Sequence, residues 1–165
     1  ALFRALHAPG SEADAAAAEQ TVLDQLDTVQ AIDEDRILRL FLGLIKAMLR
    51  TNAFVPGGPA ALAFKLESAK VPGLPKPLPW REIWVYSPRV EGIHLRGGPI
   101  ARGGLRWSDR RDDFRTEVLG LVKAQVVKNS VIVPTGAKGG FYPKQLPDPT
   151  ANRDGWAAEG LEAYK

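Results

Sequence analysis

The stretch at residues 101–142, ARGGLRWSDRRDDFRTEVLGLVKAQVVKNSVIVPTGAKGGFY, contains two glycine doublets, and a cation precedes each of them. Arg102 precedes the first doublet and Lys138 precedes the second. Because glycine lets a ligand approach the backbone closely, we expect both cations to be accessible beside their doublets. A helix-like segment between the doublets ends in Gln125 and Lys128. The three cations predict a site for a small anionic substrate.

Apolar spacing predicts a helix over residues 110–128. At about 100° per residue, one face of this helix, which we expect to point inward, carries Phe114, Val118, Leu121, Gln125 and Lys128. We expect Asp112 and Asp113 in the first turn, where carboxylates complement the helix dipole, and Lys123 on the solvated face. Polar groups are costly to bury without a partner, which makes Gln125 and Lys128 candidate ligand groups. The alternative for Lys128 is a stem that covers apolar surface while the charge reaches water.

The whole chain predicts an α/β fold, with N-terminal helices followed by a mixed sheet flanked by helices. We expect helices over residues 11–30 and 33–49, and we interpret the wide apolar face of the second as core. β-Branched and aromatic content predicts strands at 62–66, 83–86, 92–95 and 131–133, with a loop at 135–140 and a final helix at 152–164. The PGGP break at residues 56–59 predicts a division into a helical segment, 1–55, and a partial α/β domain, 56–165.

The 165 residues include no cysteine and only two histidines, His7 and His94. The sequence therefore excludes disulfides and thiolate metal sites, and we expect no metal site built on histidines. The lack of cysteine fits a reducing compartment, and we expect a cytoplasmic protein. The longest apolar run, residues 37–49, is interrupted by two cations and is shorter than the ~20 residues of a membrane span, so we expect no membrane partner. Because the chain does not begin with methionine, we expect it to be a piece of a longer protein.

Charge is distributed unevenly along the chain. Residues 1–50 contain five Lys and Arg against eight Asp and Glu, whereas residues 96–144 contain ten against four. A basic segment of this kind is typical of proteins that bind nucleic acid or another polyanion, which is one alternative function. A second alternative is a structural domain whose glycines only form turns. Few aromatic residues are interleaved with the cations and we expect Lys128 to point inward, so we favour a small anionic ligand over a nucleic-acid partner.

The glycine motifs match no common nucleotide-binding or hydrolase fingerprint. The segment PTGAKGGF departs from the P-loop pattern G-x-x-x-x-G-K-[ST], and residues 97–104 do not form G-x-G-x-x-G. The sequence contains no G-x-S-x-G nucleophile elbow. The chemistry is therefore expected from the cations beside the doublets and not from a phosphate-binding loop or a nucleophilic serine.

Two segments resemble the substrate-binding domain of the amino-acid dehydrogenase family, and within it glutamate dehydrogenase. They are GIHLRGGPIARGGLRW at residues 92–107 and EVLGLVKAQVVKNSVIVPTGAKGG at residues 117–140. They are similar to the family's segment with a cation before GG, its helix ending in Q-x-x-K and its GGAKGG loop. The segment RGGLRWSDRRDDFRTEVLGLVKAQVVKN resembles the sequence of the large-subunit, NAD-specific glutamate dehydrogenases.

The resemblance implies a role for each candidate residue. Lys138 stands at the family's catalytic lysine, and Lys128 stands at the lysine that binds the substrate α-carboxylate. Gln125 stands at a substrate-contacting glutamine, and Arg102 stands where the family usually has the lysine for the side-chain carboxylate. The chain departs from the small enzymes in this arginine, in an interval from Lys128 to Lys138 that is two residues shorter, and in a PTGAKGG loop that lacks one glycine.

Elementary chemistry agrees with this assignment. Glutamate has two carboxylates, so its site needs two separated cations, and Arg102 and Lys128 can supply them. A guanidinium is a planar fork that suits a carboxylate. A lysine among glycines and beside other cations can act as acid or base near neutral pH, which fits Lys138. Family members with apolar substrates lack a cation before the first doublet, so Arg102 favours glutamate or 2-oxoglutarate as the bound partner.

The resemblance also implies what lies outside the chain. The family's catalytic aspartate and its NAD-binding Rossmann domain would follow the equivalent of residue 165. We therefore expect this chain by itself neither to bind NAD nor to turn over substrate. The reaction expected of the whole enzyme is the oxidative deamination of L-glutamate to 2-oxoglutarate and ammonia with NAD, and we expect the full-length protein to be a homo-oligomer.

Overall fold

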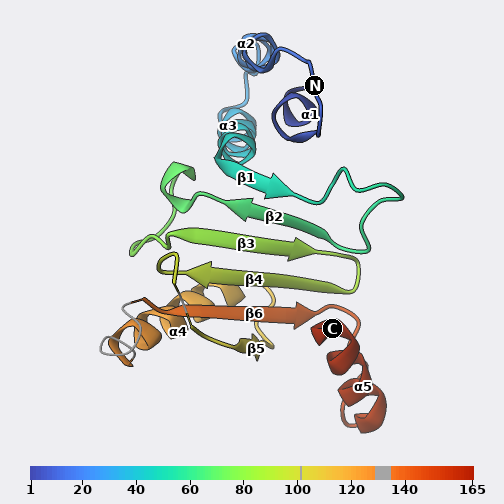
Figure 1. Cartoon of the computed structure of the whole chain (residues 1–165). Coiled ribbons are helices and arrows are strands. Elements are labelled where there is room, and N and C mark those ends of the chain that lie inside the picture. The colour runs from blue at the N-terminus through green and yellow to red at the C-terminus, as the bar shows by residue number, and fades with distance from the viewer. Residues whose placement is uncertain (101, 129–134) are drawn as a thin grey trace.

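A six-stranded mixed sheet forms the centre of the computed structural model, which describes residues 1–100, 102–128 and 135–165. The N-terminal helices lie beyond one edge of this sheet, α4 packs on one of its faces, and α5 lies near the C-terminal end of β6 (Figure 1). This arrangement confirms the predicted α/β fold with N-terminal helices followed by a mixed, helix-flanked sheet. The strand predicted at 131–133 lies outside the described residues, and the predicted division of the chain at residue 55 stays a prediction.

The elements follow one another in a simple order along the chain. The helices are α1 (Leu2–His7), α2 (Ala15–Leu26), α3 (Ile32–Ala47), α4 (Phe114–Lys128) and α5 (Arg153–Tyr164), with a short 3₁₀ helix η1 (Ser68–Lys70). The strands are β1 (Met48–Thr51), β2 (Leu62–Leu66), β3 (Arg81–Tyr86), β4 (Val90–Arg96), β5 (Leu105–Trp107) and β6 (Ala137–Pro143). The strands predicted at 62–66, 83–86 and 92–95 therefore correspond to β2, β3 and β4, and the final helix corresponds to α5.

The sheet has the strand order β1-β2-β3-β4-β6-β5. Neighbouring strands are antiparallel except β5 and β6, which are parallel and are connected through α4. Parallel neighbours need a crossover of this kind, because the chain must return to the same end of the sheet. The crossover places α4 against β4 and β6.

The N-terminal helices form a small cluster of their own. The Asp14 carboxylate accepts hydrogen bonds from the backbone N–H groups of Ala16 and Ala17 at 2.9 and 3.1 Å and so caps α2. Three acidic residues occupy the first turn of α3, where they complement the helix dipole. The buried residues of the cluster are Leu2, Leu26 and Leu42. Its core is therefore separate from the core under α4.

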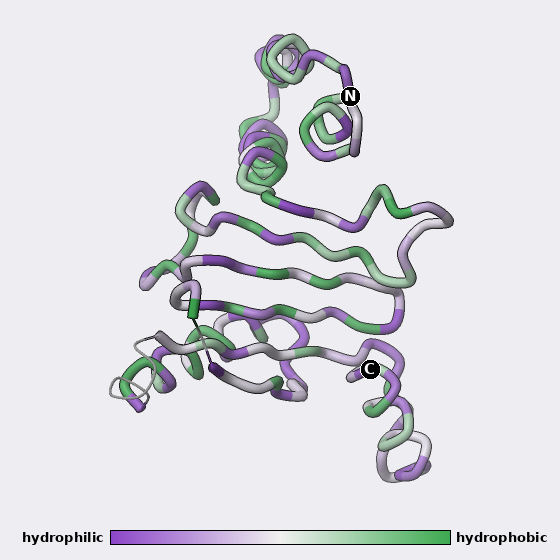
Figure 2. The backbone as a smooth tube through the Cα atoms, viewed as in Figure 1, coloured by the Kyte–Doolittle hydropathy of each residue, from purple (hydrophilic) through white to green (hydrophobic). Residues whose placement is uncertain are grey.

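The prediction that the whole apolar face of α3 is core was wrong in part. Leu42 and Ala47 are buried, but Ile37 is 48% exposed and Phe41 is 59% exposed. The reason is that α1 and α2 cover only one side of α3, and Figure 2 shows hydrophobic segments running along this helix as well as through the strands. The helix also ends earlier than predicted, because the chain turns extended at Met48 and pairs as β1 with β2.

The core under α4 is built from its apolar face and the central strands. Its buried residues are Ile93 and Leu95 of β4 with Phe114, Val118, Leu119 and Val122 of α4. Trp84 of β3 closes this core with an edge-on contact to Phe114, at 6.4 Å between ring centroids. Burial of these side chains holds α4 on the sheet, since each fully buried side chain of this size contributes about 1.5–3 kcal/mol.

A buried ion pair fixes α4 to β3. Glu82 is 1% exposed, and its carboxylate accepts hydrogen bonds from the Arg115 guanidinium of α4 at 2.5 and 3.1 Å. The Trp84 indole N–H also lies 3.3 Å from the same carboxylate. A pair of this kind adds little net stability when intact, but removal of one partner leaves the other charge buried without compensation.

Glu82→Gln should therefore lower the free energy of unfolding by about 3 kcal/mol, because Arg115 keeps its charge and loses the opposing one. Urea-induced unfolding followed by tryptophan fluorescence measures the change. Glu162→Gln is the matched control, because Glu162 forms an exposed ion pair with Lys165 and should leave unfolding unchanged. Equal effects of the two substitutions would contradict the structural role of the Glu82–Arg115 pair.

Candidate functional site

Three of the four predicted site residues line one cavity of about 400 Å³. Its lining consists of Arg102, Gly103 and Gly104 on one side and of Gln125 and Lys128 at the C-terminal end of α4 on the other. Arg102 and Lys128 are exposed, and Gln125 is half-buried. The fold thus brings together side chains that are more than twenty positions apart in the sequence.

The fourth residue, Lys138, lies on β6 beside the same glycines. It is half-buried and pairs across the sheet with Leu95, whose side chain belongs to the core under α4. The Lys138 ammonium lies 3.9 Å from the point where a β-carbon on Gly104 would stand. Lys138 therefore reaches the glycine side of the cavity from the same face of the sheet as α4.

The first doublet runs beside β6 and parallel to it. Arg102 forms a parallel bridge with Gly136, and the backbone N–H of Gly139 donates a hydrogen bond to the Gly104 carbonyl at 3.0 Å. A β-carbon on Gly103 would collide with the carbonyl of Ala137, so only glycine fits at this contact. The absence of a side chain here lets the segment of Arg102 lie close against β6, the strand that carries Lys138.

The prediction of a loop at 135–140 was wrong for residues 137–140, because these form the first part of β6. Two glycines in a row usually weaken a strand. In β6 they are required by packing, because a β-carbon on Gly140 would stand 2.5 Å from the Val118 methyl group and one on Gly139 would collide with Leu105. At the second doublet, therefore, α4 and the Leu105 side chain lie close to the backbone of β6.

The orientation predicted for α4 was correct at its start and wrong at its end. Phe114 and Val118 are buried as predicted, but Lys128 is exposed at the last turn. The exposed position of Lys123 agrees with the prediction. The buried face passes through Val118 and Val122 and does not continue to Lys128.

The start of α4 also differs from the prediction. The helix begins at Phe114, so Asp112 and Asp113 precede its first turn. The Asp113 carbonyl accepts hydrogen bonds from the backbone N–H groups of Thr116 and Glu117 at 2.9 and 3.2 Å. The aspartates still stand at the positive end of the helix dipole, where carboxylates are favourable.

The positive charge of the cavity comes from side chains. Among the described residues, no carboxylate forms an ion pair with Arg102, Lys128 or Lys138. The cavity stands at the C-terminal end of α4, where the helix dipole favours a cation such as Lys128 and does not attract an anion. An anionic ligand would therefore be held by the guanidinium and ammonium groups, with the Gln125 amide beside them.

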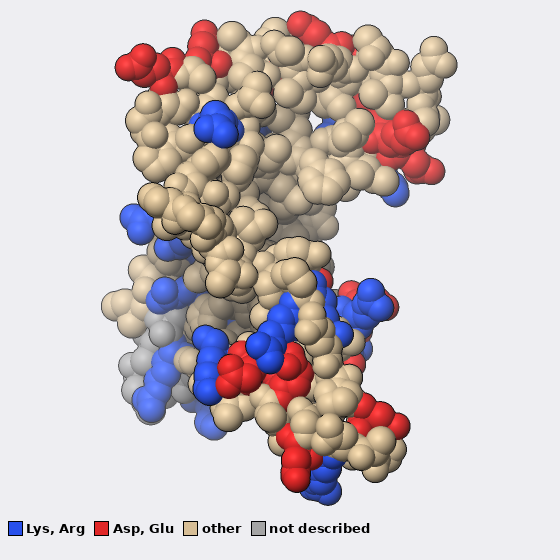
Figure 3. All heavy atoms as spheres, turned by 90° about the vertical axis from the view of Figure 1, so that its right-hand side faces the viewer, with Lys and Arg blue, Asp and Glu red and all other residues tan. Residues whose placement is uncertain are grey.

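On the face drawn in Figure 3, acidic groups lie at the helical end of the molecule, and most of the basic groups lie, together with further acidic groups, in the half that carries β6 and α5. In the described residues no group of three potential metal ligands lies together. No helix in the described part of the chain is long and apolar enough to cross a membrane.

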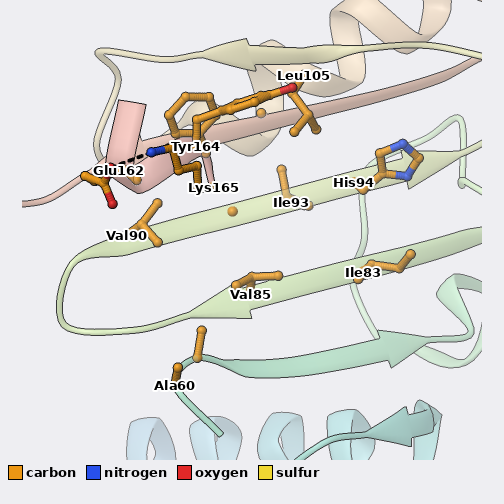
Figure 4. Close-up of a pocket in the computed structure, with 15 residues that line it drawn as sticks. Ala60, Ile83, Val85, Val90, Ile93, His94, Leu105, Glu162, Tyr164 and Lys165 are labelled. Carbon is orange, nitrogen blue, oxygen red and sulfur yellow. Dashed lines mark hydrogen bonds and ion pairs between the residues drawn. The ribbon is translucent and has the colours of Figure 1, made fainter. Parts of the chain in front are cut away.

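Two other hollows in the structure are apolar. One, of about 450 Å³, lies on the face of the sheet opposite α4, between Ile83, Val85 and His94 and the end of α5 (Figure 4). Burial, together with the charge of Arg96, lowers the pKa of His94, so this histidine is neutral there at neutral pH. The other, of about 600 Å³, lies between α3 and the sheet, where Figure 3 shows mostly uncharged atoms.

Gly103→Ala should disrupt the parallel pairing of this segment with β6, because its β-carbon would overlap the Ala137 carbonyl. We expect a loss of about 1–3 kcal/mol in the free energy of unfolding, as for other overpacked sites. Hydrogen exchange should accelerate at the amides of Ala137 and Gly139, which donate to the Arg102 and Gly104 carbonyls. Gly104→Ala is the control, because the nearest atom to its β-carbon is the movable Lys138 ammonium at 3.9 Å. Equal acceleration in both variants would contradict this account of Gly103.

Comparison with known proteins shows the family of this chain. Residues 21–165 match the family described as bacterial NAD-glutamate dehydrogenase, catalytic domain. The chain is 60% identical over 151 residues to the NAD-specific glutamate dehydrogenase of Pseudomonas aeruginosa, an alignment that covers 89% of this chain and 9% of that protein. It is 56% identical over 178 residues to the NAD-specific glutamate dehydrogenase of Mycobacterium tuberculosis, which covers 99% of this chain and 11% of that protein.

A more distant relative is the NAD-specific glutamate dehydrogenase of Neurospora crassa, which is 33% identical over 117 residues that cover 64% of this chain. The chain spans about a tenth of the length of the relatives it matches, 9% and 11% for the two bacterial proteins. The family match extends over most of the chain and includes both glycine doublets. The chain therefore belongs to the family of bacterial NAD-glutamate dehydrogenase catalytic domains.

Proposed function

We propose that this chain supplies the substrate carboxylate site and the catalytic lysine of an NAD-dependent glutamate dehydrogenase. The reaction is the oxidative deamination of L-glutamate to 2-oxoglutarate and ammonia. The observation that carries the proposal is the single cavity lined by Arg102, Gln125 and Lys128, with the Lys138 ammonium beside its glycine side. The names of the relatives, NAD-specific glutamate dehydrogenases, agree with this substrate.

Two separated cations suit the two carboxylates of glutamate. In the proposal, Arg102 binds the side-chain carboxylate, because its planar guanidinium can donate two parallel hydrogen bonds. Lys128 binds the α-carboxylate, and the Gln125 amide contacts the amino-acid end of the substrate. The two cations come from different parts of the cavity lining, the segment before β5 and the last turn of α4, so each could bind one carboxylate of the substrate.

Lys138 would handle the proton at the reacting carbon. When NAD is bound, it supplies the hydride acceptor, and the substrate becomes iminoglutarate. The Lys138 amine then takes a proton from the water molecule that adds to the imine carbon. The Lys138 ammonium returns this proton to the amino group of the carbinolamine, whose C–N bond breaks to release ammonia as its hydroxyl loses a proton and becomes the carbonyl of 2-oxoglutarate. The Lys138 side chain is half-buried on β6 and its ammonium lies close to Gly104, which lines the cavity, and this position supports the role.

The described residues do not fit a dinucleotide. The parallel unit β5-α4-β6 is the kind of crossover whose helix start can bind a pyrophosphate. Here the connection from β5 to α4 contains no glycine, and Asp112 and Asp113 stand at the helix start, where they would repel phosphates. We therefore assign no residue of this chain to NAD, and we place its binding in another part of the full-length enzyme. The cytoplasmic location and the homo-oligomeric state stay predictions.

Family membership argues against nucleic-acid binding, whereas the geometry of the cavity does not. The inward orientation expected of Lys128 was an argument against a polyanion, and the structure exposes this residue instead. Membership in the glutamate dehydrogenase family now favours the dicarboxylate. A polyanion site would show a steep decrease of affinity for single-stranded and duplex DNA as salt increases, and a glutamate site predicts no such binding.

Lys138→Ala in the full-length enzyme should lower kcat by about 10²- to 10⁴-fold, as expected for loss of a general acid–base. Steady-state assays of glutamate oxidation measure the loss. Lys123→Ala is a matched control, because Lys123 is an exposed lysine of α4 outside the cavity. The kcat of this variant should equal that of the unmodified enzyme. Near-normal turnover of the Lys138 variant would overturn its assignment.

Arg102→Ala should lower kcat/KM for glutamate by about 10- to 100-fold, because a charged hydrogen-bonding partner of the side-chain carboxylate is removed. The same variant should change kcat/KM far less for an amino acid with an apolar side chain, measured at high concentration. Arg111→Ala, an exposed arginine outside the cavity, is the control. Equal losses for both substrates would refute the dicarboxylate assignment.

A further inference from the structure

A polar cluster beside the start of α4 has no part in the proposed chemistry. The Glu117 carboxylate accepts a hydrogen bond from the Ser108 hydroxyl at 2.6 Å, and its other oxygen pairs with the Arg106 guanidinium of β5. The Ser108 hydroxyl in turn accepts from the backbone N–H of Arg110 at 3.1 Å. Ser108 is 1% exposed and the Glu117 side chain is 12% exposed, so this contact is largely shielded from water.

The cluster connects β5 and α4, the two elements that are continuous with the cavity walls. One wall, Arg102 to Gly104, continues directly into β5, which carries Arg106. The other wall is the last turns of α4, which carries Glu117 in its first turn. The Ser108 backbone N–H donates to the Phe141 carbonyl at 2.9 Å, so the same cluster is also attached to β6, the strand of Lys138.

Apolar packing holds α4 on the sheet along its first turns and does not extend to its last turn. Hydrophobic contacts are not directional, and the buried residues of α4 end at Val122, before Gln125 and Lys128. Hydrogen bonds with carboxylates are directional and strong. α4 has two such contacts on its two flanks, Arg115 with Glu82 of β3 and Glu117 with Arg106 and Ser108.

A rotation or slide of α4 would change the cavity directly. Gln125 and Lys128 lie two and three turns beyond Glu117, so a displacement at the start of the helix is transmitted along the rigid helix to both side chains. The fit at that end is close, since a β-carbon on Gly136 would stand 2.8 Å from the Gln125 β-carbon. The spacing between Arg102 and Lys128 therefore depends on what fixes α4 to β5.

We propose that Glu117 is a positioning residue of the glutamate site, which holds α4 and β5 in register through Ser108 and Arg106. The inference rests on the proposed function, because it concerns the distance between the two cations that would bind the substrate. Glu117 touches no substrate. It acts by keeping the two walls at a separation that fits a dicarboxylate.

The ionisation of Glu117 agrees with this role. The hydrogen bond from Ser108, and after it the Arg106 guanidinium, lowers the pKa of the Glu117 carboxyl below its usual range. The carboxylate is therefore charged at neutral pH and can accept from both partners at once. A neutral amide at this position could still accept from Ser108 with its oxygen, but its NH₂ group cannot accept from Arg106.

The test uses steady-state kinetics of the full-length enzyme carrying Glu117→Gln. We expect KM for glutamate to rise about five-fold, with kcat within about two-fold and KM for NAD unchanged, because a half-exposed arginine contact is lost and the chemical groups stay in place. Arg106→Gln should raise KM for glutamate similarly. The double variant should be no worse than either single one, because both substitutions remove the same contact.

Asp113→Asn is the matched control. Its carboxylate pairs with Arg110 at the surface of the same connection, at 2.8 Å from the guanidinium Nε, and contacts neither cavity wall. KM for glutamate should therefore stay unchanged in this variant. Ser108→Ala is a second test of the buried half of the cluster, and it should also raise KM for glutamate without a change in KM for NAD.

The outcomes separate this inference from the proposed function. A loss of active enzyme with unchanged KM would show that Glu117 only stabilises the fold and would overturn the inference. Unchanged KM in the Glu117, Arg106 and Ser108 variants, with a raised KM in Arg102→Ala, would overturn the inference and leave the proposed function in place. If Arg102→Ala also left KM for glutamate unchanged, the proposed function would fail. If Glu117→Gln does not fold, the Arg106 and Ser108 variants decide by the same KM criterion.

Discussion

The close approach of three backbone segments at β6 is the contact on which the rest of the structure depends. α4 packs on Gly140 through Val118, and the Arg102–Gly104 segment lies beside β6, where Gly103 faces the Ala137 carbonyl. Side chains at these glycines would separate the segments, and the cavity between them would not form as it does. Protein interiors are packed so densely that even a methyl group at such a contact displaces its neighbours. The glycine doublets therefore determine how close the cations of the candidate site can come to one another.

The positive charge of the cavity comes from side chains and not from the backbone. The cavity lies at the C-terminal end of α4, so the helix dipole stabilises Lys128 and would repel an anion. Without paired carboxylates among the described residues, Arg102, Lys128 and Lys138 keep their charge available to a ligand. The acidic groups of the region are used elsewhere: Glu82 and Glu117 hold α4 in place through Arg115, Arg106 and Ser108. The carboxylates and arginines that hold α4 in place are therefore separate from the cations of the proposed anion site.

The local sequence pattern predicted much of the fold. The strands β2, β3 and β4 and the helices α4 and α5 lie close to their predicted positions, because their apolar spacing and composition agree with their burial. The errors have a common cause. β6 was interpreted as a loop because glycines disfavour strands, and the strands β1 and β5 were missed because each is short and lies at an edge of the sheet. Tertiary packing overrides local propensity at these positions, and a propensity argument contains no information about neighbours that are distant in sequence.

The sequence by itself determined the α/β class, the family, and the identity of Arg102, Gln125, Lys128 and Lys138 as candidate residues, since motifs and residue types are properties of the chain. It also contained the carboxylates Glu82 and Glu117, but no spacing rule marked them, because their partners Arg115, Arg106 and Ser108 are matched only after the helix is placed on the sheet. Only the tertiary structure decided that the two doublets lie on adjacent parallel segments, that Lys128 is exposed, and that the cavity opens at the end of α4. These features depend on strand register and helix rotation, which arise from contacts between distant residues.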